Sequence, residues 1–135
     1  MGEYFTSLSI PANTPATAPA EKEIIIEGEI LSEIAYLIPP GWSALARFAL
    51  FYGIKQIYPE PEADWVTGDD VYKSVPIAWS MPESKLSLII KGYNTDDTYP
   101  HSVYVWLLTK SEVEAKPWKI IADFVSILKR LMGLK

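Results

Sequence analysis

The sequence predicts a mainly β domain, an antiparallel β-sandwich or jelly roll with an extended N-terminal arm and one C-terminal amphipathic helix. Short runs rich in β-branched and aromatic residues recur at near-regular spacing. Glycines and prolines separate these runs, and only the C-terminal segment repeats its apolar residues every three or four positions. With 135 residues, the chain is long enough for one domain with its own core and too short for two.

The first twenty residues are expected to form a strand and then a proline-rich arm. Residues 1–10 alternate in polarity, with these residues on one side: Tyr4, Thr6, Leu8 and Ile10. Residues 11–20 contain three prolines, which fit neither a helix nor a central strand. This segment is an extended arm or a long connection. As an arm it is suited to lie across a neighbouring subunit, because proline lowers the entropy lost on ordering.

Residues 21–112 are expected to form the sandwich, with seven or eight short strands in all. Gly28 interrupts the first β-rich run of this region, and the Pro39-Pro40-Gly41 sequence ends the second. Residues 94–101 are a polar connection between the last two strands. Beyond the N-terminal strand, the pattern predicts strands at residues 23–27, 29–37, 45–52, 54–58, 86–93 and 102–109.

Residues 115–133 are expected to form an amphipathic helix of about four turns. Pro117 suits a first helical turn, and cations stand near the C-terminal end. Nine apolar residues form a wide stripe: Trp118, Ile120, Ile121, Phe124, Val125, Ile127, Leu128, Leu131 and Met132. Because burying each is worth about 1.5–3 kcal/mol, the helix should pack on its own sandwich, on another subunit or on a membrane surface. The residues predicted to mediate docking or oligomerisation are Trp118, Ile121, Phe124, Val125, Leu128 and Met132.

The charge distribution argues against nucleic-acid binding. The net charge is −5, to which residues 115–135 contribute +4 and residues 1–114 contribute −9. A nucleic-acid-binding domain would show a basic face in its body. The opposite charges instead favour contacts between tail and body, within one chain or between chains. We expect neither a signal peptide nor a transmembrane span, because no basic start with an apolar run and no stretch of 18 apolar residues occurs.

No catalytic residue, cofactor or metal site is predicted, and the chain is not expected to be an enzyme. His101 is the only histidine, so a histidine metal cluster is excluded, and the absence of cysteine excludes thiolate chemistry and disulfides. No G-x-S-x-G, P-loop or dinucleotide-binding motif appears. We expect His101 to be a structural or surface residue.

Two acidic loops and several tryptophans leave other binding roles open. Asp69 and Asp70 form one adjacent carboxylate pair, and Asp96 and Asp97 form another. Such pairs are typical of turns, where Asp accepts backbone hydrogen bonds, but they could also bind Ca²⁺ or act in glycoside hydrolysis. Trp65 stands beside the first pair.

The aromatic residues near strand ends could form a sugar-binding surface, although cores and subunit interfaces use the same residues. The candidate aromatic residues are Trp42, Trp65, Trp79, Tyr58, Tyr72 and Tyr99.

Five segments give the sequence an overall resemblance to small β-sandwich structural proteins of tailed phages and archaeal viruses. They are residues 10–15, 38–41, 52–59, 65–70 and 93–101. The resemblance covers about residues 5–110 and leaves the C-terminal helix outside. It implies a virion role as a capsid decoration, minor capsid or tail-associated subunit.

The sequence therefore predicts a non-enzymatic structural assembly protein of a virion, acting as a homo-oligomer. Its expected partners are copies of itself and other structural proteins of the capsid. Two alternatives remain open: a carbohydrate-binding or adhesin module that uses the tryptophan and aspartate loops, and a peripheral membrane protein held by the C-terminal helix.

Overall fold

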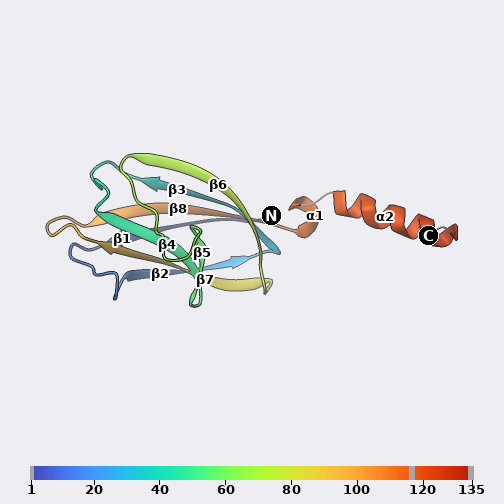
Figure 1. Ribbon diagram of the computed structural model, residues 1–135, viewed down its shortest axis with the longest axis horizontal. Helices are drawn as coiled ribbons and strands as arrows, with labels where there is room; N and C mark the ends of the chain where they lie inside the picture. Colours follow the sequence, from blue (N-terminus) through green and yellow to red (C-terminus); the bar gives the residue numbers. More distant parts are fainter. Residues whose placement is uncertain (1, 116–117, 134–135) are drawn as a thin grey trace.

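Eight strands and two helices make up most of the computed structural model, which describes residues 2–115 and 118–133 (Figure 1). The strands are β1 (Gly2–Ile10), β2 (Ala20–Glu27), β3 (Ile30–Ile38), β4 (Ala46–Tyr52), β5 (Lys55–Tyr58), β6 (Val71–Ser80), β7 (Lys85–Asn94) and β8 (His101–Lys110). The helices are α1 (Glu112–Ala115) and α2 (Trp118–Leu131). The predicted mainly β fold is confirmed, since two four-stranded antiparallel sheets pack into a β-sandwich.

The strands pair as a long ribbon folded back on itself. The first sheet has the order β1-β8-β3-β6 and the second the order β2-β7-β4-β5. The pairs β1–β8, β2–β7, β3–β6 and β4–β5 are all antiparallel, and β3–β8 and β4–β7 join them within each sheet. From β1 to β4 the chain crosses between the sheets at every connection.

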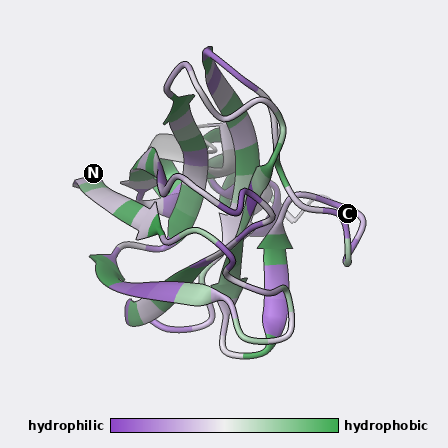
Figure 2. Cartoon of the chain, turned by 90° about the vertical axis from the view of Figure 1, so that its left-hand side faces the viewer, coloured by the Kyte–Doolittle hydropathy of each residue, from purple (hydrophilic) through white to green (hydrophobic). Residues whose placement is uncertain are grey.

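Alternating burial along the strands produces the core. In β8, the side chains of Val103, Val105 and Leu107 point into the sandwich and are buried. Figure 2 shows this alternation as bands of hydrophobic and hydrophilic residues along the strands. The residues of β1 follow the predicted pattern, because Thr6, Leu8 and Ile10 are buried on one side. Each large aliphatic side chain buried in this way stabilises the fold by about 1.5–3 kcal/mol.

The two layers approach each other closely at Gly92 in β7. A Cβ at this position would lie 2.5 Å from Cδ1 and 2.9 Å from Cγ1 of Ile10 in the opposite sheet. Only glycine therefore allows the layers to approach this far without moving Ile10.

The sequence pattern did not single out β6. This strand contains Pro76, which lacks a backbone N–H and lowers the β signal of its surroundings. The structure accommodates Pro76 because β6 is the edge strand of its sheet, where one side of the backbone needs no partner.

Of the two expectations for residues 11–20, an extended arm or a long connection, the structure shows the connection. Residues 11–19 connect β1 to β2 across the end of the sandwich. The Asn13 amide donates to the Asp96 carbonyl (2.8 Å), and the Asn94 amide donates to the Thr14 carbonyl (2.9 Å). These bonds hold the segment to its own chain, so the alternative of a long connection is the correct one.

The predicted C-terminal helix forms and extends beyond the end of the sandwich along its long axis (Figure 1). Pro117, the expected first-turn residue, lies outside the described residues. The apolar side chains of the helix do not pack on its own sandwich, because they are exposed. Packing on another subunit or on a membrane surface stays a prediction. Within the described part of the chain, no helix is long and apolar enough to cross a membrane.

Candidate functional site

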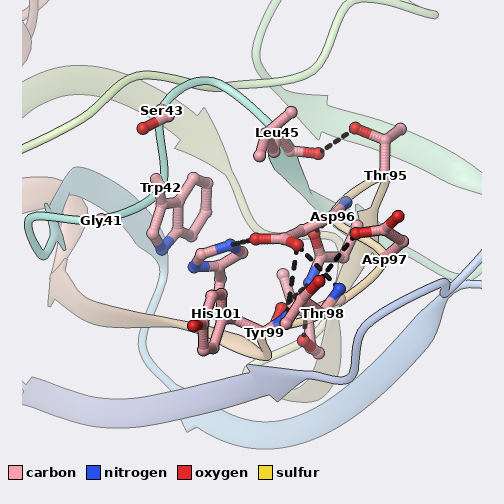
Figure 3. Close-up of polar contacts among 12 residues, drawn as sticks. Gly41, Trp42, Ser43, Leu45, Thr95, Asp96, Asp97, Thr98, Tyr99 and His101 are labelled. Carbon is pink, nitrogen blue, oxygen red and sulfur yellow. Dashed lines mark hydrogen bonds and ion pairs between the residues drawn. The ribbon is translucent and has the colours of Figure 1, made fainter.

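The second acidic loop is held together by its own carboxylate (Figure 3). Oδ1 of Asp96 accepts hydrogen bonds from the amides of Thr98 (2.9 Å) and Tyr99 (3.2 Å), and Oδ2 lies 2.9 Å from Nε2 of His101. The Thr98 amide and the His101 ring lower the pKa of Asp96 below its ordinary value. Asp97 accepts a hydrogen bond from the hydroxyl of Thr98. The loop is thus a turn fixed by its acidic residues, with His101 as a structural partner.

Asp69 fixes the neighbouring loop in the same way. Its Oδ1 accepts hydrogen bonds from the amides of Gly41 (2.8 Å) and Ser43 (3.0 Å). The Ser43 amide, followed by the Gly41 amide, lowers the pKa of Asp69. Asp70, by contrast, is exposed and has a positive φ of 50°. Among the described residues, no group of three or more Asp, Glu or His side chains could hold a metal ion.

Trp42 belongs to the core and cannot line a binding surface. It is 1% exposed, and its indole Nε1 donates to the Ser102 carbonyl (2.9 Å). Its ring packs edge-on against Phe48, with 6.4 Å between the ring centroids. The ring of His101 lies 6.2 Å away on the same measure. Of the roles that the sequence left open for Trp42, a sugar-binding surface, a subunit interface or the core, the structure shows the core.

The other two tryptophans considered for a sugar-binding surface, Trp65 and Trp79, have ring neighbours different from those of Trp42. Trp65 is half-buried between Phe51 (5.7 Å between ring centroids) and Tyr93 (5.1 Å), over the second sheet. Trp79 is half-buried in β6 and packs against Tyr52 at 5.6 Å. The aromatic residues predicted to gather near the acidic loops thus have separate neighbours.

The apolar face of α2 is exposed to solvent. All nine apolar residues of the predicted stripe are between 40% and 79% exposed, including every predicted docking residue: Trp118, Ile121, Phe124, Val125, Leu128 and Met132. They form two adjacent heptad-spaced rows, of which Trp118, Ile121, Val125, Leu128 and Met132 make the first and Ile120, Phe124, Ile127 and Leu131 the second. A helix of 14 residues is marginal in water without a packing partner.

A second apolar surface, which the sequence analysis did not predict, covers the outside of the β1-β8-β3-β6 sheet. We call it the aromatic face; it consists of the outward side chains Phe5, Tyr72, Tyr104, Trp106 and Leu108. Phe5 stacks on Tyr104 at 6.4 Å and contacts Trp106 at 5.2 Å, while Tyr72 meets Trp106 edge-on at 6.2 Å.

A groove of about 310 Å³ runs along the aromatic face. Its lining includes Tyr72, Trp106 and Leu108, and its charged residues are Glu3 and Glu33. The signal for this surface was present in β8, where Tyr104, Trp106 and Leu108 alternate with an equally apolar inner row. A strand that is apolar on both sides is typical of a sheet covered on both faces.

No protein-family model and no curated protein matches the sequence. Among solved structures, a mitogen derived from Yersinia pseudotuberculosis is 12% identical with a TM-score of 0.42, over 80% of this chain and 86% of that one. A chain of the capsid asymmetric unit of cyanophage Pam1 is 13% identical with a TM-score of 0.45, over 78% of this chain and 82% of that one. These low values concern β architecture alone, and no function follows from them.

Proposed function

We propose that the chain is a non-enzymatic structural assembly protein that acts as a homo-oligomer through α2. The observation that carries this proposal is the exposure of eight apolar side chains on one short helix and of Met132 directly after it. Burying them against another protein molecule would stabilise both the helix and the complex, at about 25 cal/mol per Å² of apolar surface. No comparable gain is available within the chain as it is folded, because α2 points away from the sandwich (Figure 1).

The proposed setting is a virus particle, as a capsid decoration, minor capsid or tail-associated subunit. The strand orders β1-β8-β3-β6 and β2-β7-β4-β5 follow the pattern of an eight-stranded jelly roll. That architecture is used by viral capsid and lectin domains. The virion role rests on this analogy of fold and on the sequence resemblance, and the assembly role rests on the exposed helix.

Binding of carbohydrate through the acidic loops is less well supported. Asp69 and Asp96 already accept backbone hydrogen bonds, and Trp42 is buried. A sugar would therefore compete with backbone amides for the carboxylates of Asp69 and Asp96, and Trp42 would offer it no platform.

A membrane-surface role is favoured by the same exposed helix. Lys129 and Arg130 in its last turn could face lipid headgroups while the apolar rows enter the interface. This alternative differs from assembly in its partner, so flotation with anionic vesicles separates the two.

Light scattering over a range of concentrations tests the proposal. We expect the wild-type protein to reach a multiple of its 15.2 kDa chain mass, and the Ile121→Ser/Leu128→Ser variant to remain a single chain. Ser126→Asn, on the polar side of α2, is the matched control and should behave as the wild type. A single-chain mass at all concentrations, together with flotation on vesicles, would contradict assembly in favour of membrane binding.

A further inference from the structure

We propose that α2 of one copy docks on the aromatic face of a second copy. This inference rests on the proposed assembly function and names the surface that receives the helix. The chain exposes two large apolar surfaces, one convex on α2 and one grooved on the β1-β8-β3-β6 sheet, and each lacks a cover in the single chain. Joining them would remove both from water.

The charges of the two surfaces are complementary. The charged residues that line the groove are both acidic, Glu3 and Glu33. The sequence of α2 contains three basic residues and one acidic residue, and its last turn holds Lys129 and Arg130. At 100° per residue, Lys129 lies beside the first apolar row, so its amine can reach a carboxylate at the rim of the groove. Two α2 helices packed together would instead bring like charges close.

The dimensions of the two elements also match. Fourteen helical residues span about 21 Å, and the ten residues of β8 span about 33 Å. A helix about 10 Å wide covers roughly two strand spacings of 4.7–4.9 Å. Laid along β8, α2 would cover that strand and the facing halves of β1 and β3, which carry most of the aromatic face.

The other large groove fits the helix less well. It has a volume of about 540 Å³ and lies between β5 and β6, and its lining contains one acid and one base, Glu60 and Lys73. That mixed pair gives no preference for a basic helix. The aromatic face therefore combines apolar area and opposite charge in a way that the edge groove does not.

The position of α2 implies that the helix on the aromatic face comes from a second copy of the chain. In each chain, α2 lies beyond the end of the sandwich that follows β8 and does not cover its own sheet (Figure 1). Each copy then offers one helix and one receiving face, so the contact is head-to-tail. Contacts of this kind close into rings or continue as filaments.

Cysteine cross-linking tests the docking directly, because the chain has no cysteine of its own. One full-length variant carries Ser7→Cys on the outer side of β1, next to Phe5 and paired with Tyr104. Another carries Ala122→Cys, beside the apolar rows of α2. Mixed and oxidised, the two should form a disulfide-linked heterodimer. The control replaces Ser7→Cys with Ser87→Cys, a serine on the outer side of the other sheet, and should give little product.

Trp106→Ser, in the aromatic face, gives a second test through the dissociation constant of the oligomer. Loss of a central aromatic anchor should raise the dissociation constant of the oligomer roughly 30-fold, whereas Ile25→Ser on the other sheet should leave it within about twofold. The fold should persist in both, because Trp106 and Ile25 point outward.

Different outcomes separate this inference from the proposed function. If the protein assembles but the Ala122→Cys variant links mainly to itself, helix–helix packing replaces docking on the aromatic face. If the double variant Ser7→Cys/Ala122→Cys closes a disulfide within one chain, the helix folds back, and the inference is overturned. A protein that stays monomeric at all concentrations contradicts both.

Discussion

The two ends of the sandwich differ in whether their polar and apolar side chains have partners within the chain. At the loop end, where β8 begins, Asp69, Asp96 and His101 are bonded to the surrounding loops, and Trp42 fills the core beneath them. At the end where β8 finishes, the chain continues into a helix whose apolar side chains lie in water. The acidic residues and the tryptophan thus act within the chain, and the helix has no such internal role.

The largest effect expected at the loop end is that of Trp42→Ala. Removing this buried side chain leaves a cavity beside Phe48 and removes the hydrogen bond to the Ser102 carbonyl. We expect the free energy of unfolding to fall by about 3–5 kcal/mol, as for other buried large-to-small aromatic changes. Urea unfolding followed by circular dichroism measures it. A loss below about 1 kcal/mol would mean that Trp42 is not a core residue.

Gly92→Ala extends the comparison to the middle of the sandwich. The new Cβ would press on Ile10, and the layers would have to separate. We expect a loss of about 1–3 kcal/mol in unfolding free energy, measured in the same way. Ser87→Ala, on the outer side of the same strand, is the control and should change little. Equal values for both variants would show that the layers are not in close contact at Gly92.

Acid should weaken the loop end before it affects the helix. Asp69 and Asp96 have pKa values below the ordinary 3.8, so their carboxylates stabilise the fold above that pH. This contribution is lost as the pH falls below 3.8 through the lowered values. We expect Asp69→Asn and Asp96→Asn to flatten the decline of stability in this range. Unfolding measured at several pH values checks it, and wild-type steepness in both variants would count against the hydrogen-bonded loops.

The smallest effect on the stability of the single chain is expected from Ile121→Ser in α2. Ile121 is 66% exposed, so its loss should change the unfolding free energy of the dilute protein by about 0.5 kcal/mol or less. Ile34→Ser, in the buried row of β3, provides the contrast and should destabilise the fold strongly. A large effect of Ile121→Ser at low concentration would show that α2 packs on its own sandwich.

Local patterns predicted the strands and the helix well, because alternation and helical spacing are properties of neighbouring residues. They did not predict β6, since Pro76 is tolerated only by virtue of the edge position that the whole sheet creates. Nor did they place residues 11–19. The hydrogen bond from Asn13 to Asp96 that holds this segment joins residues more than 80 positions apart.

For the candidate surfaces too, the sequence shows the local pattern but not what depends on the whole fold. The apolar rows of α2 are evident from the sequence, and the exposure of the rows is not. The aromatic face joins Phe5, Tyr72 and Trp106 from three strands, so it exists only once β1, β8, β3 and β6 are in register. For Trp42 the sequence left a sugar-binding surface, a subunit interface and the core open, because a position near a strand end does not fix where the ring points; the structure places the ring in the core.

Hydrogen–deuterium exchange of the α2 amides at low and high protein concentration tests the central claim most directly. A helix of 14 residues that is covered only in the assembly should exchange quickly in dilute solution and become protected as the concentration rises. The β8 amides should be protected throughout. Fast exchange of residues 118–131 at every concentration, with no protection gained on assembly, would contradict the account.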